Sequence, residues 1–282
     1  MHLVWVTSGK KPTLRNGITE ELNFCFFSSM NMDYSDFFKQ NRGNLWARRW
    51  WSVLPLVFIQ ICSSAFADPL YLDTVLGSER LLKADFNLPY FQVSAYVDAQ
   101  ENLGFCAPAS IAAVLNSLQG VKRPIPNKYR RYGYFTQSDL FTEQSSQVRT
   151  YDAAAKRGFT LQQVSDFLWK LKIPNQIYWG DDQTIDNLRT LVKQSSIDPN
   201  QRLIVNFSRK IFSQEGDGHY SPVVAYDSDS DSVLIFDVAK FKYQPFWVTL
   251  EELQSSIQTL DNDSQRSRGL VVVIKPTETD GE

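Results

Sequence analysis

The stretch QENLGFCAPASIAAVLNSL, residues 100–118, decides the fold because it changes character at its single cysteine. The residues before Cys106 are polar and irregular, whereas those after it are small and apolar. Pro108 falls in a first turn, where a proline is well tolerated. The apolar positions then recur at helical spacing: Ile111, Val114, Leu115 and Leu118. This pattern predicts a helix that begins at Cys106.

The overall composition is that of an ordinary globular protein. Of the 282 residues, 43% are hydrophobic and 21% are charged, and a chain of this length buries a sizeable core. The net charge of −2 gives no general attraction to nucleic acid or to anionic membranes, so neither is an expected partner. The chain has three cysteines, Cys25, Cys62 and Cys106. They are too few for a disulfide framework, and no two of them form the CxxC pair that is typical of a zinc site.

Residues 1–67 resemble a leader segment. The stretch LWARRWWSVLPLVFIQICSSAFADP, residues 45–69, has a basic start, a short apolar centre and an A-x-A site that ends at Ala67. We expect cleavage between Ala67 and Asp68 and export to the periplasm, with no stable membrane association afterwards. A buried helix or an uncleaved membrane anchor is the alternative. The long segment before the basic start favours a later initiator, Met30 or Met32.

Removal of this leader would leave one thiol, Cys106, and one imidazole, His219. An internal disulfide is then excluded. A Cys/His metal site is not expected either, because tetrahedral zinc sites need several such ligands. We therefore predict that residues 68–282 hold no metal of their own. No repeat or evident linker divides these residues, so a single domain is expected.

Helical patterns precede strand-like runs within this domain. The segments TLQQVSDFLWKLKI (160–173) and TIDNLRTLVKQSSI (184–197) have the spacing of amphipathic helices. Four runs are typical of strands: RLIVNFSR (202–209), HYSPVVAYD (219–227), SVLIFDVAK (232–240) and GLVVVIKP (269–276). The order predicts an α+β fold in which an N-terminal helical part packs on a mostly antiparallel sheet. The proline-broken basic segment VKRPIPNKYRRYGYF (121–135) is expected to be a surface loop.

Two motifs resemble functional sites without their required features. Alternating acids at Asp227, Asp229 and Asp231 imitate the opening of a calcium loop. However, the sixth and twelfth positions are serine and valine instead of glycine and glutamate, so a hairpin turn is expected. The glycosylation sequon at Asn206 lies inside a strand-like run and is expected to be inert.

Cys106 is placed where a thiol becomes reactive. The partial positive charge at a helix N-terminus lowers the pKa of a thiol toward the nucleophilic thiolate. The alternative is a small buried hydrophobe, the commoner role of a free cysteine. Gln100 lies six residues earlier, and its amide is suitably spaced to join the Cys106 backbone N–H in binding the oxyanion of a tetrahedral intermediate.

His219 and Asp237 are candidate partners for this thiol. His219 follows a glycine-containing turn and opens a strand, a position that suits a general base, although a lone histidine is often structural. Asp237 ends an apolar strand, where a carboxylate is costly to bury unless it is paired. Pairing with the far nitrogen of His219 would satisfy the carboxylate and orient the imidazole ring.

The chain order Cys, His, Asp with Gln ahead of Cys is the papain-type arrangement, although papain-like proteases generally have Asn as the third member. Three blocks make the resemblance specific: GFCAPASIAAVLNSL (104–118), NFSRKIFSQEGDGHYSPVVAYD (206–227) and VLIFDVAKFKYQPFWVTL (233–250). Together they resemble the phytochelatin synthases, papain-like γ-glutamylcysteine dipeptidyl transpeptidases. The resemblance covers roughly residues 88–276 and implies a papain-like cysteine protease fold.

Carried over by position, the resemblance implies Cys106 as nucleophile, His219 as base, Asp237 as orienting acid and Gln100 in the oxyanion hole. It also implies that two arginines lie near carboxylates of the substrate, where a guanidinium fork suits bidentate binding. These are Arg209 and Arg268, for which an ordinary surface position is the alternative.

The sequence departs from the plant-type pattern in two ways. Ala107 follows the nucleophile where those members usually carry glycine, a small change that is not expected to abolish the chemistry. The segment VVVIKPTETDGE, residues 271–282, is not followed by the cysteine-rich region of the long members. Metal responsiveness and robust polymer synthesis, which the resemblance links to that region, are therefore in doubt.

The implied reaction is cleavage of the Cys–Gly bond of glutathione through a γ-Glu-Cys thioester, with release of glycine. Transfer to water gives γ-Glu-Cys, and transfer to glutathione or a γ-Glu-Cys peptide gives phytochelatin. The short architecture resembles prokaryotic members, so hydrolysis is expected to dominate. No bound cofactor is implied, and a heavy metal such as cadmium would enter as a glutathione thiolate complex. The oligomeric state, a homodimer included, is left open.

Two other readings stay open at this point. One is a general papain-like peptidase that cleaves ordinary α-peptides, which the three-block resemblance disfavours. The other is a non-catalytic protein that binds a soft metal through Cys106, for which one thiol and one imidazole are a poor ligand set.

Overall fold

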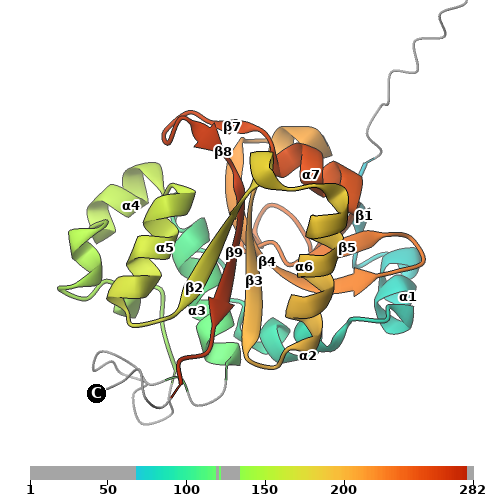
Figure 1. The fold of residues 1–282 in the computed structure, drawn as a ribbon, viewed down its shortest axis with the longest axis horizontal. Coiled ribbons are helices and arrows are strands. Elements are labelled where there is room, and N and C mark those ends of the chain that lie inside the picture. The colour runs from blue at the N-terminus through green and yellow to red at the C-terminus, as the bar shows by residue number, and fades with distance from the viewer. Residues whose placement is uncertain (1–67, 119–120, 122–133, 278–282) are drawn as a thin grey trace, which may run out of the picture. The chain divides into compact units, whose positions relative to one another are not determined.

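The computed structural model describes residues 68–118, 121 and 134–277 (Figure 1). The leader expected in residues 1–67 and most of the predicted loop at 121–135 lie outside the described residues, and both stay predictions. No helix in the described part of the chain is long and apolar enough to cross a membrane.

A seven-stranded sheet runs through the centre of the domain in the order β1-β6-β5-β4-β3-β9-β2 (Figure 1). Every strand pairing of the described residues is antiparallel, as predicted. The strands of this sheet are β1 (Leu70–Tyr71), β2 (Asn175–Trp179), β3 (Gln201–Ser208), β4 (Gly218–Asp227), β5 (Ser232–Ile235), β6 (Phe246–Thr249) and β9 (Gly269–Ile274). A small hairpin of β7 (Leu260–Asp261) and β8 (Arg266–Ser267) precedes β9.

Helices cover both faces of this sheet (Figure 1). Helices α3 and α5 pack on one face, and α6 and α7 pack on the other. The α-helices of the described residues are α1 (Val75–Lys83), α2 (Leu88–Val93), α3 (Cys106–Ser117), α4 (Tyr151–Arg157), α5 (Leu161–Lys170), α6 (Ile185–Ile197) and α7 (Leu250–Ile257). The α+β prediction is confirmed, and the second helical layer on the opposite face is an addition to it.

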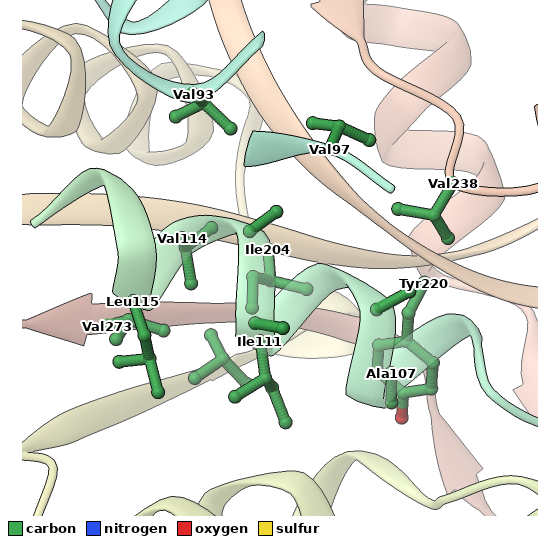
Figure 2. Close-up of a cluster of buried hydrophobic side chains, with 14 of the residues drawn as sticks. Val93, Val97, Ala107, Ile111, Val114, Leu115, Ile204, Tyr220, Val238 and Val273 are labelled. Carbon is green, nitrogen blue, oxygen red and sulfur yellow. The ribbon is translucent and has the colours of Figure 1, made fainter. Parts of the chain in front are cut away.

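The two cores follow from the alternation of side chains along the strands. On β3, Ile204 joins the core against α3, whereas Leu203 and Val205 join the core against α6 and α7. Figure 2 shows the first of these cores, in which Ile111 and Val114 of α3 lie near Ile204. Because both faces of the central strands are buried, their sequences are almost continuously apolar.

Local signals explain the predicted helices. Thr160 and Gln163 form a complete capping box at the start of α5, and the Thr184 side chain caps the backbone at the start of α6. Both helices begin within one residue of the predicted segment. Each of the four predicted strand segments overlaps an observed strand, β3, β4, β5 or β9, but β5 ends at Ile235, well short of the predicted end at residue 240.

Both of the misleading motifs lie in the described part of the chain. Asp229 and Asp231 lie in the turn between β4 and β5, whereas Asp227 is the last residue of β4. Asp231 has a left-handed backbone and forms an ion pair with Arg189 at 2.8 Å. The described residues contain no cluster of three or more His, Cys, Asp or Glu side chains placed to bind a metal. Asn206 is only 2% exposed inside β3, so its sequon is inaccessible in the folded chain.

Candidate active site

Cys106 is the first residue of α3, as predicted. No side chain caps this helix, so its first backbone N–H groups are available to the thiol, and the backbone groups of Tyr220 and Ala107 help to lower the pKa of the thiol. Gly104 fixes the approach to the helix, because a Cβ there would lie 2.1 Å from the carbonyl oxygen of Ala154. This close packing against α4 explains why a glycine stands two residues before the cysteine.

His219 lies at the start of β4, the strand on which α3 packs. Its Nε2 is 2.9 Å from Oδ1 of Asp237, so the interaction of the ring with the Cys106 thiol falls to Nδ1. The side chain of His219 is buried, as is that of Cys106. The structure therefore brings the predicted nucleophile, base and acid together in one constellation.

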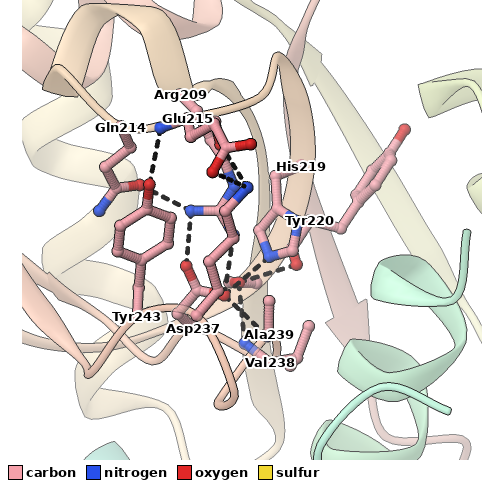
Figure 3. A network of polar contacts seen from close by, with 11 residues as sticks. Arg209, Gln214, Glu215, His219, Tyr220, Asp237, Val238, Ala239 and Tyr243 are labelled. Carbon is pink, nitrogen blue, oxygen red and sulfur yellow. Dashed lines mark hydrogen bonds and ion pairs between the residues drawn. The ribbon is translucent and has the colours of Figure 1, made fainter. Parts of the chain in front are cut away.

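Asp237 reaches His219 because β5 pairs with β4. The backbone N–H of Val238 contacts the hydroxyl of Ser221 at 3.4 Å, which keeps the residues after β5 beside the start of β4. Asp237 is fully buried, and its Oδ1 also accepts a hydrogen bond from the N–H of Ala239 at 2.8 Å. Figure 3 shows this carboxylate between His219 and Arg209.

The electrostatics favour a thiolate paired with an imidazolium. Burial alone would raise the pKa of the Cys106 thiol, but the hydrogen bond and charge of His219 bring it below its ordinary value. Burial would likewise lower the pKa of His219, but Asp237 and then Cys106 raise it. Burial would raise the pKa of Asp237, yet His219 and Arg209 hold it far below the usual range.

Gln100 is anchored beside this constellation. Its backbone N–H donates to the carbonyl oxygen of Val238 at 2.9 Å, directly after the catalytic acid. Its amide Nε2 donates to the carbonyl of Asn102 at 2.7 Å, and its buried Oε1 has no hydrogen-bond partner among the described residues. Its role in the oxyanion hole stays a prediction.

Arg209 does not have the surface position that was the alternative: it is 4% exposed, and its guanidinium binds the protein's own carboxylate, Asp237. Its Nη1 is 2.7 Å from Oδ2 of Asp237 and its Nη2 is 3.0 Å from Oδ1. The Asp237 carboxylate has two oxygens, and His219 contacts only one of them. A buried carboxylate therefore needs a second polar partner, and this need was the signal for Arg209 that sequence reasoning missed. The predicted contact of Arg209 with a substrate carboxylate stays a prediction.

Arg268, in contrast, lines the cavity that opens beside Cys106. The cavity has a volume of about 390 Å³. Arg268 contacts Asp217 at 3.1 Å and Thr259 at 3.1 Å, and a Cβ on Gly218 would lie only 2.2 Å from its Nη1. This placement is compatible with the predicted contact to a substrate carboxylate, which stays a prediction.

Sequence reasoning missed several residues of the cavity wall. Tyr220 follows the catalytic base, and its hydroxyl accepts a hydrogen bond from Asn206 Nδ2 at 2.9 Å. Both line the cavity, as does Asp261 from the β7–β8 hairpin. Strand pairing was the available signal for the first two, since residues 206 and 220 lie opposite each other on β3 and β4.

A cysteine at the start of a buried helix, an imidazole on the facing strand and a carboxylate behind it define a papain-type site for nucleophilic catalysis by a thiol. The family model for phytochelatin synthase matches residues 71–270, and the chain belongs to that family.

Named relatives agree with this assignment. The chain is 29% identical over 190 residues to glutathione gamma-glutamylcysteinyltransferase 2 of Arabidopsis thaliana, across 66% of this chain and 40% of that protein. It is 28% identical over 208 residues to the glutathione gamma-glutamylcysteinyltransferase of Schizosaccharomyces pombe, across 72% and 48%. The chain thus spans less than half the length of either relative. Among solved structures it is similar to xylellain, a cysteine protease from Xylella fastidiosa, with 12% identity, a TM-score of 0.34 and coverage of 76% and 88%.

Proposed function

We propose that this protein is a glutathione γ-glutamylcysteinyltransferase that also hydrolyses glutathione. The observation that carries the proposal is the buried constellation of Cys106, His219 and Asp237 beside a cavity of about 390 Å³. Membership of the phytochelatin synthase family supports the choice of substrate.

In the first half of the reaction, the Cys106 thiolate attacks the carbonyl carbon of the Cys–Gly peptide bond. The negative charge moves to the carbonyl oxygen, where the backbone N–H of Cys106 and the amide of Gln100 donate to it. The intermediate then collapses, the C–N bond breaks, and His219 gives its proton to the departing amine of glycine. A γ-Glu-Cys thioester on Cys106 remains, and the imidazole is neutral.

In the second half, neutral His219 removes a proton from the acceptor. A water molecule yields γ-Glu-Cys, and the amine of a second glutathione or of a growing γ-Glu-Cys peptide yields phytochelatin. Both routes restore the thiolate–imidazolium pair. We rank hydrolysis first. No resident cofactor takes part, and cadmium enters as the thiolate complex of the substrate.

Glycine release tests this function directly. The native protein should release glycine from glutathione, with or without cadmium, whereas Cys106→Ala should release none. Mass spectrometry should find one γ-Glu-Cys group on Cys106 of the native protein. A reporter α-peptide tests the general-peptidase alternative. Faster cleavage of that peptide than of glutathione, or equal glycine release by the native and Cys106→Ala proteins, would contradict the proposal.

A further inference from the structure

Arg209 is bound to the catalytic carboxylate and does not line the cavity beside Cys106. Two of its nitrogens contact the two oxygens of Asp237: Nη2 donates a hydrogen bond to Oδ1, and Nη1 forms an ion pair with Oδ2, so the guanidinium engages both carboxylate oxygens. Because Asp237 is fully buried, this contact lies entirely inside the protein.

The surroundings of the guanidinium hold it in this orientation. Its Nη1 donates to Oε1 of Gln214 at 2.6 Å, and Figure 3 shows Gln214 and Tyr243 near the guanidinium. The guanidinium carbon lies 4.8 Å from the ring centroid of Tyr243 and 5.6 Å from that of Phe207. Gly216, at φ +109°, lets the following turn pass close to Arg209, because a Cβ there would lie 3.3 Å from its Cδ. The turn that leads to the base thus also encloses the arginine.

We propose that Arg209 is a positioning residue that keeps Asp237 oriented and ionised throughout the catalytic cycle. The proposal rests on the cysteine chemistry of the proposed function. His219 loses its positive charge when it protonates the departing amine, and the buried carboxylate would then lack a cationic partner. Arg209 provides a permanent positive charge at that step, so the proton of His219 goes to the leaving group and not to Asp237.

The charged and titratable groups that face this pair come from several segments, and one of them is Tyr243, whose ring centroid lies 4.8 Å from the Arg209 guanidinium carbon. Two groups face Asp237: Arg209, which directly follows β3, and His219, which lies in β4. His219 faces Asp237 on one side and Cys106 of α3 on the other. The Cys106 thiol also lies close enough to the phenol of Tyr220 to influence its pKa.

The rival role for Arg209 is direct binding of a substrate carboxylate, and alkylation of Cys106 separates the two roles without any substrate. The full-length protein is treated with iodoacetamide across the pH range, and modification is measured at Cys106 by peptide mass spectrometry. In Arg209→Met, the acid limb of the rate profile should move up by about one pH unit, which slows alkylation roughly tenfold at pH values on that limb. Arg209→Lys, which retains charge but not the fork, should recover part of the rate.

A double-mutant cycle with Asp237→Asn adds the second readout. If Arg209 acts through Asp237, then Arg209→Met should reduce glycine release greatly in the native background and little in the Asp237→Asn background. Arg189→Lys is the matched control, because it breaks a similar Arg–Asp fork at the β4–β5 turn. It should leave the alkylation profile and kcat unchanged.

Specific results would overturn the proposal. One is an alkylation profile that does not shift in Arg209→Met. Another is a double variant in which the losses from Arg209→Met and Asp237→Asn multiply. The third is a rise in KM of Arg209→Met with an unchanged kcat. If Arg209→Met does not fold, Arg209→Lys and the double variant, which lacks both buried charges, decide by the same criteria. Because alkylation requires no glutathione, a protein that releases no glycine yet shows the shifted profile would refute the proposed substrate and leave the role of Arg209 intact.

Discussion

The two ends of strand β4 carry similar groups in different settings. At its start, His219 and Asp237 meet Arg209 in a buried cluster. At its end, Asp231 meets a forked Arg189 in a turn, with the carboxylate side chain 39% exposed. An exposed ion pair is worth little, whereas a buried one is strongly destabilising when one partner is removed. The comparison shows that the degree of burial, more than the residue types, distinguishes the catalytic cluster at the start of β4 from the ion pair at its end.

The largest expected effect is the loss of the buried carboxylate. Asp237→Ala leaves Arg209 as an uncompensated buried charge, which typically costs about 3–5 kcal/mol in the free energy of unfolding. It also removes the orienting partner of His219, so glycine release should fall to background. Urea denaturation and the glycine assay measure the two losses. Asp231→Ala is the matched control, and equal destabilisation by the two substitutions would refute the contrast between the two ends.

The next effect concerns the reactivity of the thiol. In the native protein, Cys106 should be alkylated at pH values well below the ordinary thiol pKa of about 8.5, because the imidazolium of His219 stabilises the thiolate. His219→Ala should move the rate profile toward that ordinary value. Iodoacetamide alkylation followed across the pH range at Cys106 gives the measurement. A profile that is the same in both proteins would show that the two side chains are not paired.

The pH dependence of stability follows from the same groups. The folded pKa of Asp237 is depressed, so its stabilisation is present above the unfolded value of about 3.9 and is lost as the pH falls below it. The folded pKa of His219 is raised, so its contribution is present below about 6.5 and is lost as the pH rises through the folded value. Urea midpoints of the native protein and Asp237→Asn should therefore converge on acidification.

The placement of the three catalytic side chains could largely be predicted from the sequence, because the signals for it are local. The helix start at Cys106, the strand after His219 and the apolar run before Asp237 each lie within a few residues of the side chain they position. The papain-type order of the residues and the family resemblance then connected them.

The remaining features depend on contacts between distant segments. Arg209 lies 28 residues from Asp237, and nothing local distinguishes it from a surface arginine. The short strands β2 and β6 and the helix α7 were not predicted, and α7 interrupts the expected order of helices before strands. A helical layer on the second sheet face follows from the buried strands only once the sheet topology is known.

Substitutions at two glycines before the catalytic base should separate the roles of Arg209 and Arg268, because Gly216 packs against the first and Gly218 against the second. Gly216→Ala strains a backbone at φ +109° and presses on Arg209, so kcat and stability should both fall, the latter by about 1–3 kcal/mol. Gly218→Ala places a Cβ against Arg268 in the cavity wall and should act mainly on KM for glutathione. Steady-state kinetics of both variants separate the two roles. The reverse assignment of kcat and KM would contradict them.

The smallest effect is expected at the far end of β4. Asp231→Asn keeps a residue that tolerates the left-handed backbone at φ 47° but removes the charge that Arg189 and the Tyr226 hydroxyl now contact. The melting temperature should fall slightly at low ionic strength, and the difference should shrink in high salt because exposed charges are screened. Thermal melts at two salt concentrations, with glycine release measured alongside, give the comparison. A loss of kcat would mean that the two ends of the strand are coupled, because no charge of the catalytic cluster is altered by this substitution.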